Sequence, residues 1–334
     1  MSEPNNDQNS RDGALSLEQG NAICYSGYRQ GQSPEKGIFP TYDDVKEDLL
    51  ILEKNWDLLR LYDCSPHARV VLNVIHKEGL DFKVMLGLKM AAEENNPRCP
   101  TGVEYSERML EVNRKRNSNE VKRGIGLSKR YPDLVFAVSV GNGASAGRTD
   151  HMVPVESLIA YIGKLKSEID HPITFCENHA AWTSKLDPLA AELDFISVHS
   201  YPIWDHHTVE DALEYTKQNY YSVANRYPDK HVIFSGAGWT TASNGRGIES
   251  GNATEERQAR YYEELLAWTT SENILTFVFE AFDEPWKGSP DPLEPEKHWG
   301  LFNFDRTPKL VMQDLYAECV AANKPVKLLA NADR

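Results

Sequence analysis

Short, nearly continuous apolar runs recur along the chain and are separated by longer stretches that mix apolar and charged residues. Runs such as VFAVSV (135–140) and HVIFS (231–235) lack the alternation of a strand with one wet face. They therefore predict strands buried on both faces, as parallel strands are. The predicted strands are Ala22–Tyr25, Leu58–Tyr62, Lys83–Leu88, Phe136–Val140, Ile173–Cys176, Phe195–Val198, His231–Phe234 and Ile274–Phe279.

The stretches between these strands have helical spacing. Tyr42–Lys54 and Pro154–Ser167 place apolar residues among charges at intervals of three and four, and Ala253–Thr270 opens on TEER, which is typical of a helix start. Eight β units separated by helices predict a closed (β/α)8 barrel, the TIM-barrel fold, as one α/β domain over residues 21–334. An open doubly wound sheet is disfavoured because no glycine-rich phosphate loop follows the first strand.

Residues 1–20 are polar and predict a disordered lead-in to the barrel. They lack the apolar core of a signal peptide. The sequence leaves two locations open, the cytoplasm or an exported protein whose signal has been removed.

Charge narrows the choice of partner. The 334 residues carry 36 Lys and Arg against 50 Asp and Glu, a formal net charge of −14. Such a surface repels phosphate backbones and anionic lipid, which argues against nucleic acid and membranes as partners. No apolar run approaches the ~18 residues of a membrane span. A neutral polysaccharide is compatible with this charge, and we expect a monomer.

Cysteine and histidine give no sign of a metal site. The five cysteines have no CxxC spacing and read as buried small residues: Cys24, Cys64, Cys99, Cys176 and Cys319. His199, His206 and His207 lack a third ligand at fitting spacing. We therefore expect neither a metal nor another cofactor.

Polar and aromatic side chains follow the predicted strands, at the end of a barrel where function gathers. Aromatic rings stack on the aliphatic faces of sugars, and amides and carboxylates bind the hydroxyls. Any one of these residues could simply cap the core, but the bias recurs around the barrel and predicts a sugar groove. The predicted substrate-binding residues are Tyr28, Arg60, Tyr62, Asp63, Asn142, Tyr201, Trp239, Glu280, Glu284, Trp286 and Lys287.

Several motifs together resemble glycoside hydrolase family 17, the bacterial endo-β-1,3-glucanases and related transglycosylases. The similarity covers roughly residues 21–318 and is most specific in FVFEAFDEPWKG (277–288) and HWGLFNFDRTPK (298–309). It is supported by RLYDC (60–64), VSVGN (138–142), SVHSYP (197–202) and AGWTT (237–241). The resemblance implies a retaining reaction on β-1,3-glucan. It also implies that the acidic residues Glu280 and Glu284 help to bind substrate and organise the site with Lys287.

The family's two catalytic glutamates are absent from their motifs. Where the family has VGNE, with the acid/base glutamate after strand 4, this chain has VGNG and therefore Gly143. Where the family has EAGW, with the nucleophile at the end of strand 7, it has GAGW and therefore Gly236. The loop 144–148 (ASAGR) is also unusually small. Glycine can neither donate a proton nor attack carbon, so no ordinary hydrolysis is expected.

Three interpretations remain open at this point. The chain is a glycoside hydrolase scaffold whose hydrolysis has been abolished and which still binds β-glucan. Alternatively, it is a glycan-binding protein that uses the inherited groove. The third alternative is an active glycosidase with relocated carboxylates, for which Glu177 and Glu280 are the first candidates.

Overall fold

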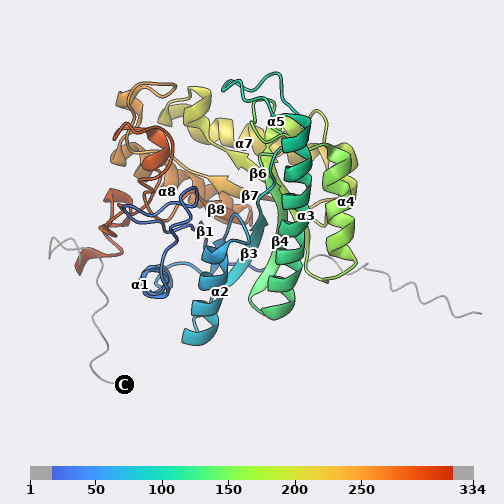
Figure 1. The fold of residues 1–334 in the computed structure, drawn as a ribbon. Helices are drawn as coiled ribbons and strands as arrows, with labels where there is room; N and C mark the ends of the chain where they lie inside the picture. Colours follow the sequence, from blue (N-terminus) through green and yellow to red (C-terminus); the bar gives the residue numbers. More distant parts are fainter. Residues whose placement is uncertain (1–16, 319–334) are drawn as a thin grey trace, which may run out of the picture.

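The computed structural model describes residues 17–318 and contains a closed barrel of eight parallel strands in sequential order. Figure 1 shows the helices packed around the outside of the strands. The predicted (β/α)8 barrel is confirmed. The strands are β1 (Ala22–Cys24), β2 (Leu58–Arg60), β3 (Lys83–Leu88), β4 (Val135–Asn142), β5 (Ile173–Asn178), β6 (Ile196–Ser200), β7 (Val232–Ala237) and β8 (Thr276–Val278).

The helices follow the strands as a barrel requires, with two short ones between β5 and β6. Short 3-10 turns, η1 (Pro202–Asp205), η2 (Ser250–Asn252), η3 (Pro295–Lys297) and η4 (Leu310–Met312), lie in the connections. The helices are α1 (Tyr42–Leu52), α2 (Pro66–Glu78), α3 (Glu107–Arg130), α4 (Val155–Lys166), α5 (His179–Trp182), α6 (Asp187–Glu192), α7 (Val209–Arg226) and α8 (Glu255–Ser271).

Local chemistry explains where these helices begin and end. Thr41 and Asp44 form a reciprocal capping box at the start of α1, which satisfies two backbone N–H groups. Helix α2 has Pro66 in its first turn, where the missing N–H costs nothing. It ends at Gly79, whose φ of 66° suits glycine.

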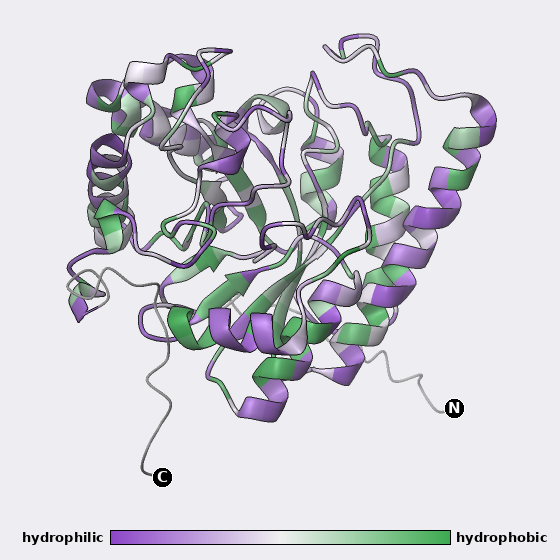
Figure 2. Cartoon of the chain, turned by 60° about the vertical axis from the view of Figure 1, so that its left-hand side comes forward, coloured by the Kyte–Doolittle hydropathy of each residue, from purple (hydrophilic) through white to green (hydrophobic). Residues whose placement is uncertain are grey.

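The core has an inner and an outer layer. Inside the barrel, residues from successive strands pack together, among them Cys24, Met85 and Phe277. Their strand neighbours point outward and pack against the helices. This is why the strands read as continuous apolar runs, and Figure 2 shows apolar strands inside helices that are polar on their outer sides.

The predicted lead-in and the predicted barrel domain both extend beyond the described residues. Residues 1–16 of the predicted lead-in and residues 319–334 of the predicted barrel domain lie outside the described residues. Residues 17–20 are described, and Leu17 is buried against the inner layer of the barrel.

Strand pairing is irregular near the carboxyl ends of the strands. Register shifts occur between Ser139 and Asn142 on β4 and between Val198 and His199 on β6. Another lies between Phe234 and Ala237 on β7. Such irregularities re-aim side chains and are common beside active sites. They lie at the end of the barrel where the sequence predicts the groove.

Candidate active site

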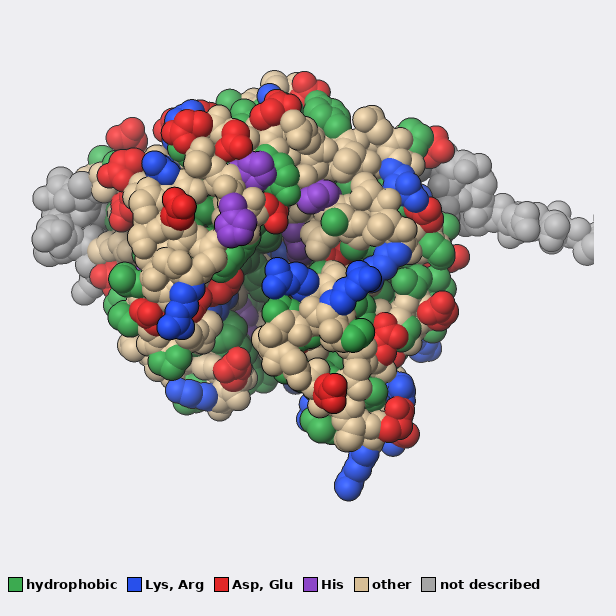
Figure 3. Space-filling view, turned by 90° about the horizontal axis from the view of Figure 1, so that it is seen from above, with side chains coloured by type: hydrophobic (Ala, Val, Ile, Leu, Met, Phe, Trp, Pro, Cys, Tyr) green, Lys and Arg blue, Asp and Glu red, His purple; other side chains and the backbone are tan. Residues whose placement is uncertain are grey.

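Two cavities lie at the carboxyl ends of the strands and share Tyr62, Asn142, Phe279 and Glu296. Their volumes are about 600 and 190 Å³, and together we call them the groove. Figure 3 looks onto this face and shows a hollow at its centre, with Lys and Arg side chains along one side. The groove collects nine of the predicted substrate-binding residues: Tyr28, Arg60, Tyr62, Asp63, Asn142, Tyr201, Glu284, Trp286 and Lys287.

A lysine between two glutamates forms the charged centre of the groove. The Lys287 ammonium lies 2.7 Å from both carboxylate oxygens of Glu280 and 2.6 Å from Oε2 of Glu284. Both glutamates are 1% exposed, but Glu284 lines the larger cavity, whereas Glu280 lines neither cavity and lies behind Lys287. The cluster predicted from the β8 motif is therefore assembled, with Glu280 as its buried member.

The two glutamates differ in proton affinity. Burial raises the pKa of Glu280 well above its ordinary value, although Lys287 opposes the shift and the charge of Glu284 adds to it. Burial acts in the same direction on Glu284, but Lys287, the Ser26 hydroxyl and the Trp286 indole hold its pKa below the usual range. The two carboxylates raise the pKa of Lys287 despite its burial. Glu284 is therefore the charged acceptor that faces the groove.

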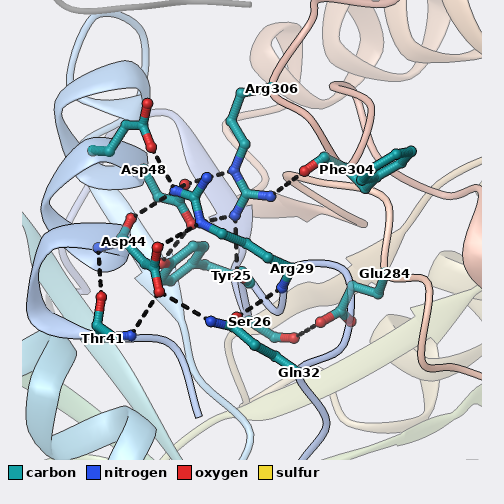
Figure 4. Close-up of polar contacts among 12 residues, drawn as sticks. Tyr25, Ser26, Arg29, Gln32, Thr41, Asp44, Asp48, Glu284, Phe304 and Arg306 are labelled. Carbon is teal, nitrogen blue, oxygen red and sulfur yellow. Dashed lines mark hydrogen bonds and ion pairs between the residues drawn. The ribbon is translucent and has the colours of Figure 1, made fainter. Parts of the chain in front are cut away.

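The loop after β1 reaches this cluster and is fixed by a buried ion network (Figure 4). The Ser26 hydroxyl donates a hydrogen bond to Glu284. Asp48 of α1 accepts two bonds of 2.7 Å from Arg306 and one of 2.8 Å from Arg29. Arg306 also donates to the backbone carbonyl of Gly27, 2.9 Å away. The network thereby anchors the loop that carries Ser26.

Arg60 connects three strand ends beneath the smaller cavity. Its guanidinium is 2% exposed, donates to the backbone carbonyl of Ser235 at 2.8 Å and binds the side-chain oxygen of Asn142. Its charge also lies 4.7 Å from the centroid of the Tyr62 ring. Arg60 therefore orients Asn142 and holds the backbone next to Gly236.

The two glycines of the altered motifs have different surroundings. Gly143 has a φ of 65°, and a Cβ atom built on it would meet nothing within 4 Å. Its N–H donates to the Cys176 carbonyl at 2.9 Å. A Cβ atom on Gly236 would collide with the hydroxyl oxygen of Tyr201. That hydroxyl therefore fills the space that a side chain at 236 would enter.

The structure separates the two tryptophans that the sequence treated alike. Trp286 is half-buried on the groove wall, donates to Glu284 at 3.1 Å and meets the Tyr28 ring edge-on. Trp239 is 1% exposed, donates to the Asn252 carbonyl at 2.9 Å and packs against Tyr261 of α8. The prediction that Trp239 lines the groove is wrong, because its ring points into the layer between β7 and α8.

Glu177, a candidate relocated carboxylate, is 1% exposed and does not line the groove. Its two oxygens accept backbone N–H bonds from Ser145 at 2.8 Å and Asn178 at 2.7 Å. Burial raises its pKa to about 7, although these two bonds favour the charged form. Glu177 thus holds the small loop that follows Gly143.

This shifted pKa predicts a pH-dependent stability. A carboxyl that titrates near pH 7 when folded and near its ordinary 4.5 when unfolded stabilises the fold below about pH 4.5. That contribution, about 3 kcal/mol, is lost as the pH rises through 7. Glu177→Gln removes this pH dependence, so the stability of the parent relative to the variant is expected to fall by about 3 kcal/mol from pH 4.5 to 8. Denaturant unfolding across this range measures it, and parallel profiles would contradict the assignment.

Sequence reasoning missed several wall residues, of which three bear on the chemistry of the groove. Glu296 of η3 lines both cavities and has no hydrogen-bond or ion-pair partner within residues 17–318. Burial raises its pKa. His67 of α2 and Trp299 after η3 complete the walls. Trp299 lies in the HWGLFNFDRTPK motif, which was the available signal; the other two had none.

Within the described part of the chain, no group of three or more His, Cys, Asp or Glu residues could hold a metal ion. Over the same range, no helix is long and apolar enough to cross a membrane.

Comparison with known families decides what kind of site this is. A family model described as "BtgE/BtgC glycoside hydrolase domain" matches residues 22–300. The chain belongs to this family. The BtgE/BtgC match spans all eight strands of the barrel.

Relatives of this family carry related descriptions. The chain is 24% identical to a "glucan 1,3-beta-glucosidase" of Arthroderma benhamiae, over 85% of this chain and 88% of that protein. Longer curated relatives also match, and the chain spans 40% or less of their length.

Solved structures agree with this assignment. An endo-laminarinase from Formosa Hel1_33_131 matches with a TM-score of 0.80 and 25% identity, over 94% of this chain and 92% of that one. A family 17 β-1,3-glucanosyltransferase from Rhizomucor miehei, solved also as an active-site mutant with laminaritriose, matches with TM-scores of 0.68 and 0.69. It is 22% identical over 87% of this chain and 96% of that one, and so supports the fold alone. The resemblance to glycoside hydrolase family 17 is confirmed, and the barrel is that of the β-1,3-glucan-acting glycoside hydrolases.

Proposed function

We propose that this protein binds β-1,3-glucan oligo- or polysaccharide in the groove and does not hydrolyse it. The observation that carries the proposal is a groove lined by aromatic and charged side chains, combined with glycine at 143 and 236. Tyr28, Trp286 and the cluster of Glu284 and Lys287 supply stacking surface and hydroxyl partners. The Rhizomucor relative, an active-site mutant of the same fold, holds laminaritriose.

In the proposed mechanism, hydrolysis is absent because the two catalytic carboxyl groups are missing, although the sugar-binding groove is present. A retaining reaction needs a general acid and a nucleophile whose carboxyl groups lie ~5–5.5 Å apart across the anomeric carbon. Neither Gly143 nor Gly236 can supply one. Losing the general acid alone costs about 10²–10⁴ in rate, and losing the nucleophile removes the covalent route. Sugar binding depends on neither group.

Calorimetry with laminari-oligosaccharides tests the binding half of this proposal. We expect saturable binding of laminaripentaose. A cello-oligosaccharide of equal length is expected to bind with no higher affinity. Absence of binding to laminaripentaose by folded protein would contradict the proposal.

One observation favours a second candidate, an active glycosidase with relocated carboxylates. Glu296 is unpaired among the described residues, lines both cavities and has a raised pKa, which are properties of a general acid. If it serves that role, the purified protein releases sugar from β-1,3-glucan and Glu296→Gln abolishes the release. If the parent protein releases no sugar from β-1,3-glucan, this candidate function is excluded.

The two tryptophans are expected to respond in opposite ways to truncation. Trp286→Ala removes a half-exposed stacking surface, so affinity for laminaripentaose is expected to fall by about 1–3 kcal/mol with little change in Tm. Trp239→Ala empties a core site and is expected to cost about 3–5 kcal/mol of stability. Calorimetry and thermal unfolding of both variants measure the difference. Unchanged affinity in a stable Trp286→Ala protein would show that this ring only packs.

A further inference from the structure

A basic concavity lies beside the groove, against the trend of a protein with a formal net charge of −14. It has a volume of about 470 Å³ and shares Asp63, Lys89 and Arg116 with the larger cavity of the groove. Arg69 of α2 and Arg123 of α3 also line it. A group attached to a sugar in the groove can therefore reach this space, which we call the basic patch.

The acidic residues of the basic patch are already engaged. Glu120 binds Arg123 through Oε2 and accepts backbone N–H bonds from Cys64 at 2.7 Å and Lys89 at 3.3 Å through Oε1. Asp63 accepts the Ser65 backbone N–H at 3.0 Å. The carboxylates thus shape the walls of the basic patch.

Three cations of the basic patch remain available to a ligand. Within residues 17–318, neither Arg69 nor Lys89 has a side-chain hydrogen bond or an ion pair, and Arg116 reaches only the neutral side chain of Asn113, at 3.5 Å. They come from α2, from the end of β3 and from α3, so the fold rather than a single basic run brings them together. Counting all six charged lining groups, four cations face two carboxylates.

We propose that the basic patch binds an oxyanion substituent, a sulfate ester or a carboxylate, carried by a glucan chain in the groove. Guanidinium and ammonium groups recognise such oxyanions through charge-assisted hydrogen bonds. The overall negative charge repels free anions at long range, so selection falls on an anion delivered by a bound sugar. This inference rests on the proposed sugar binding in the groove.

The test compares three ligands by calorimetry on the full chain: laminaripentaose, sulfated laminaripentaose and inorganic sulfate. We expect the sulfated pentaose to bind about tenfold more tightly than the neutral one at low salt, as a few exposed ion pairs allow. At about 0.5 M salt the preference is expected to fall, because exposed charges are screened.

Matched variants assign the effect to the basic patch. Lys89→Gln/Arg116→Gln is expected to bring the affinity for the sulfated pentaose down to that for the neutral pentaose, which is measured on the same variant because both residues also line the groove. The control, Arg108→Gln/Lys122→Gln, removes the same charge from exposed positions of α3 outside the cavities and is expected to keep the preference. All four positions are exposed, so folding is expected to be unaffected.

The outcomes separate this inference from the proposed function. The inference would be overturned if the sulfated pentaose is not preferred, or if the preference survives Lys89→Gln/Arg116→Gln. In either case, binding of the neutral pentaose would still support the proposed function of the groove. Inorganic sulfate that binds as tightly as the sulfated pentaose would also overturn it, because the patch would then be a free-anion site. Sulfated pentaose that binds through the patch while neutral pentaose does not bind would support the patch and contradict the proposed neutral ligand.

Discussion

The double variant Gly143→Glu/Gly236→Glu is expected to hydrolyse β-1,3-glucan at least about 10⁴-fold faster than the parent protein, with each single variant near background. An acid and a nucleophile act as a unit, so restoring one without the other recovers little. Other residues of the groove are assembled around the two positions. Arg60 holds Asn142 beside position 143, and Glu284 and Lys287 line the groove.

The two substitutions face different obstacles. Gly143 has open space around it, but its φ of 65° lies in the left-handed region, where a residue with a Cβ is strained by about 1–2 kcal/mol. At Gly236 the obstacle is the Tyr201 hydroxyl, the far end of a side chain whose ring packs against Phe279 and Trp299, each at 5.3 Å. A small displacement of that hydroxyl lets it donate a hydrogen bond to the new carboxylate.

Reducing-end assays and NMR of the product anomers measure this prediction. We expect the β-configuration to be retained. If the double variant is folded but inert, adding Tyr201→Phe removes the obstructing hydroxyl. A triple variant that is also folded and inert would contradict our assignment of positions 143 and 236. Full activity in either single variant would show that another residue, Glu296 first, already fills the other role.

Lys287→Met is expected to destabilise the protein by about 3–5 kcal/mol, because it breaks a buried ion pair from one side. Lys287 is the cation that both oxygens of the buried Glu280 contact, and methionine leaves that carboxyl uncompensated. In the parent protein Lys287 lowers the pKa of Glu280 against the effect of burial, so without Lys287 that pKa rises further and Glu280 takes up a proton. A folded pKa raised above the unfolded value means that stability is lost as the pH rises. The deficit of the variant is therefore expected to grow from pH 5 to pH 8.

Urea unfolding at the two pH values measures the effect. The control is Lys164→Met, which breaks an exposed pair with Glu168 of the same 2.7 Å length and is expected to cost no more than about 1 kcal/mol. Equal losses in the two variants would show that the Glu280–Lys287 pair contributes no more than a surface contact.

The barrel could be predicted from the sequence because strands buried on both faces are apolar along their whole length, and one exceptional residue does not obscure that pattern. In β7, VIFSGA is buried at every position, inside and outside the barrel alike. The strand ends then placed Arg60, Asn142 and the β8 cluster near one another, since parallel strands end at the same edge.

The features of the site that could not be predicted from the sequence depend on loop conformation and on the direction of side chains beyond the strands. In the sequence both Asn142 and Trp239 follow a predicted strand, but Asn142 is paired within β4, whereas Trp239 lies beyond the last residue of β7. There the period of two no longer fixes side-chain direction, and the Trp239 ring turns toward α8. Glu296 lies in a 3-10 turn with no periodicity to place it. Lys89 and Arg116 are 27 positions apart and meet only because α3 folds back along β3.

A long incubation of laminarihexaose with the parent protein shows whether bound sugar stays uncut. Laminarihexaose is incubated with excess parent protein, at a concentration that keeps most of the sugar bound, and the products are separated by chromatography over days. Intact laminarihexaose is expected at every time point. Shorter or longer oligosaccharides that form in proportion to the parent protein would contradict this expectation, and their loss with Glu296→Gln would assign the cutting to that residue.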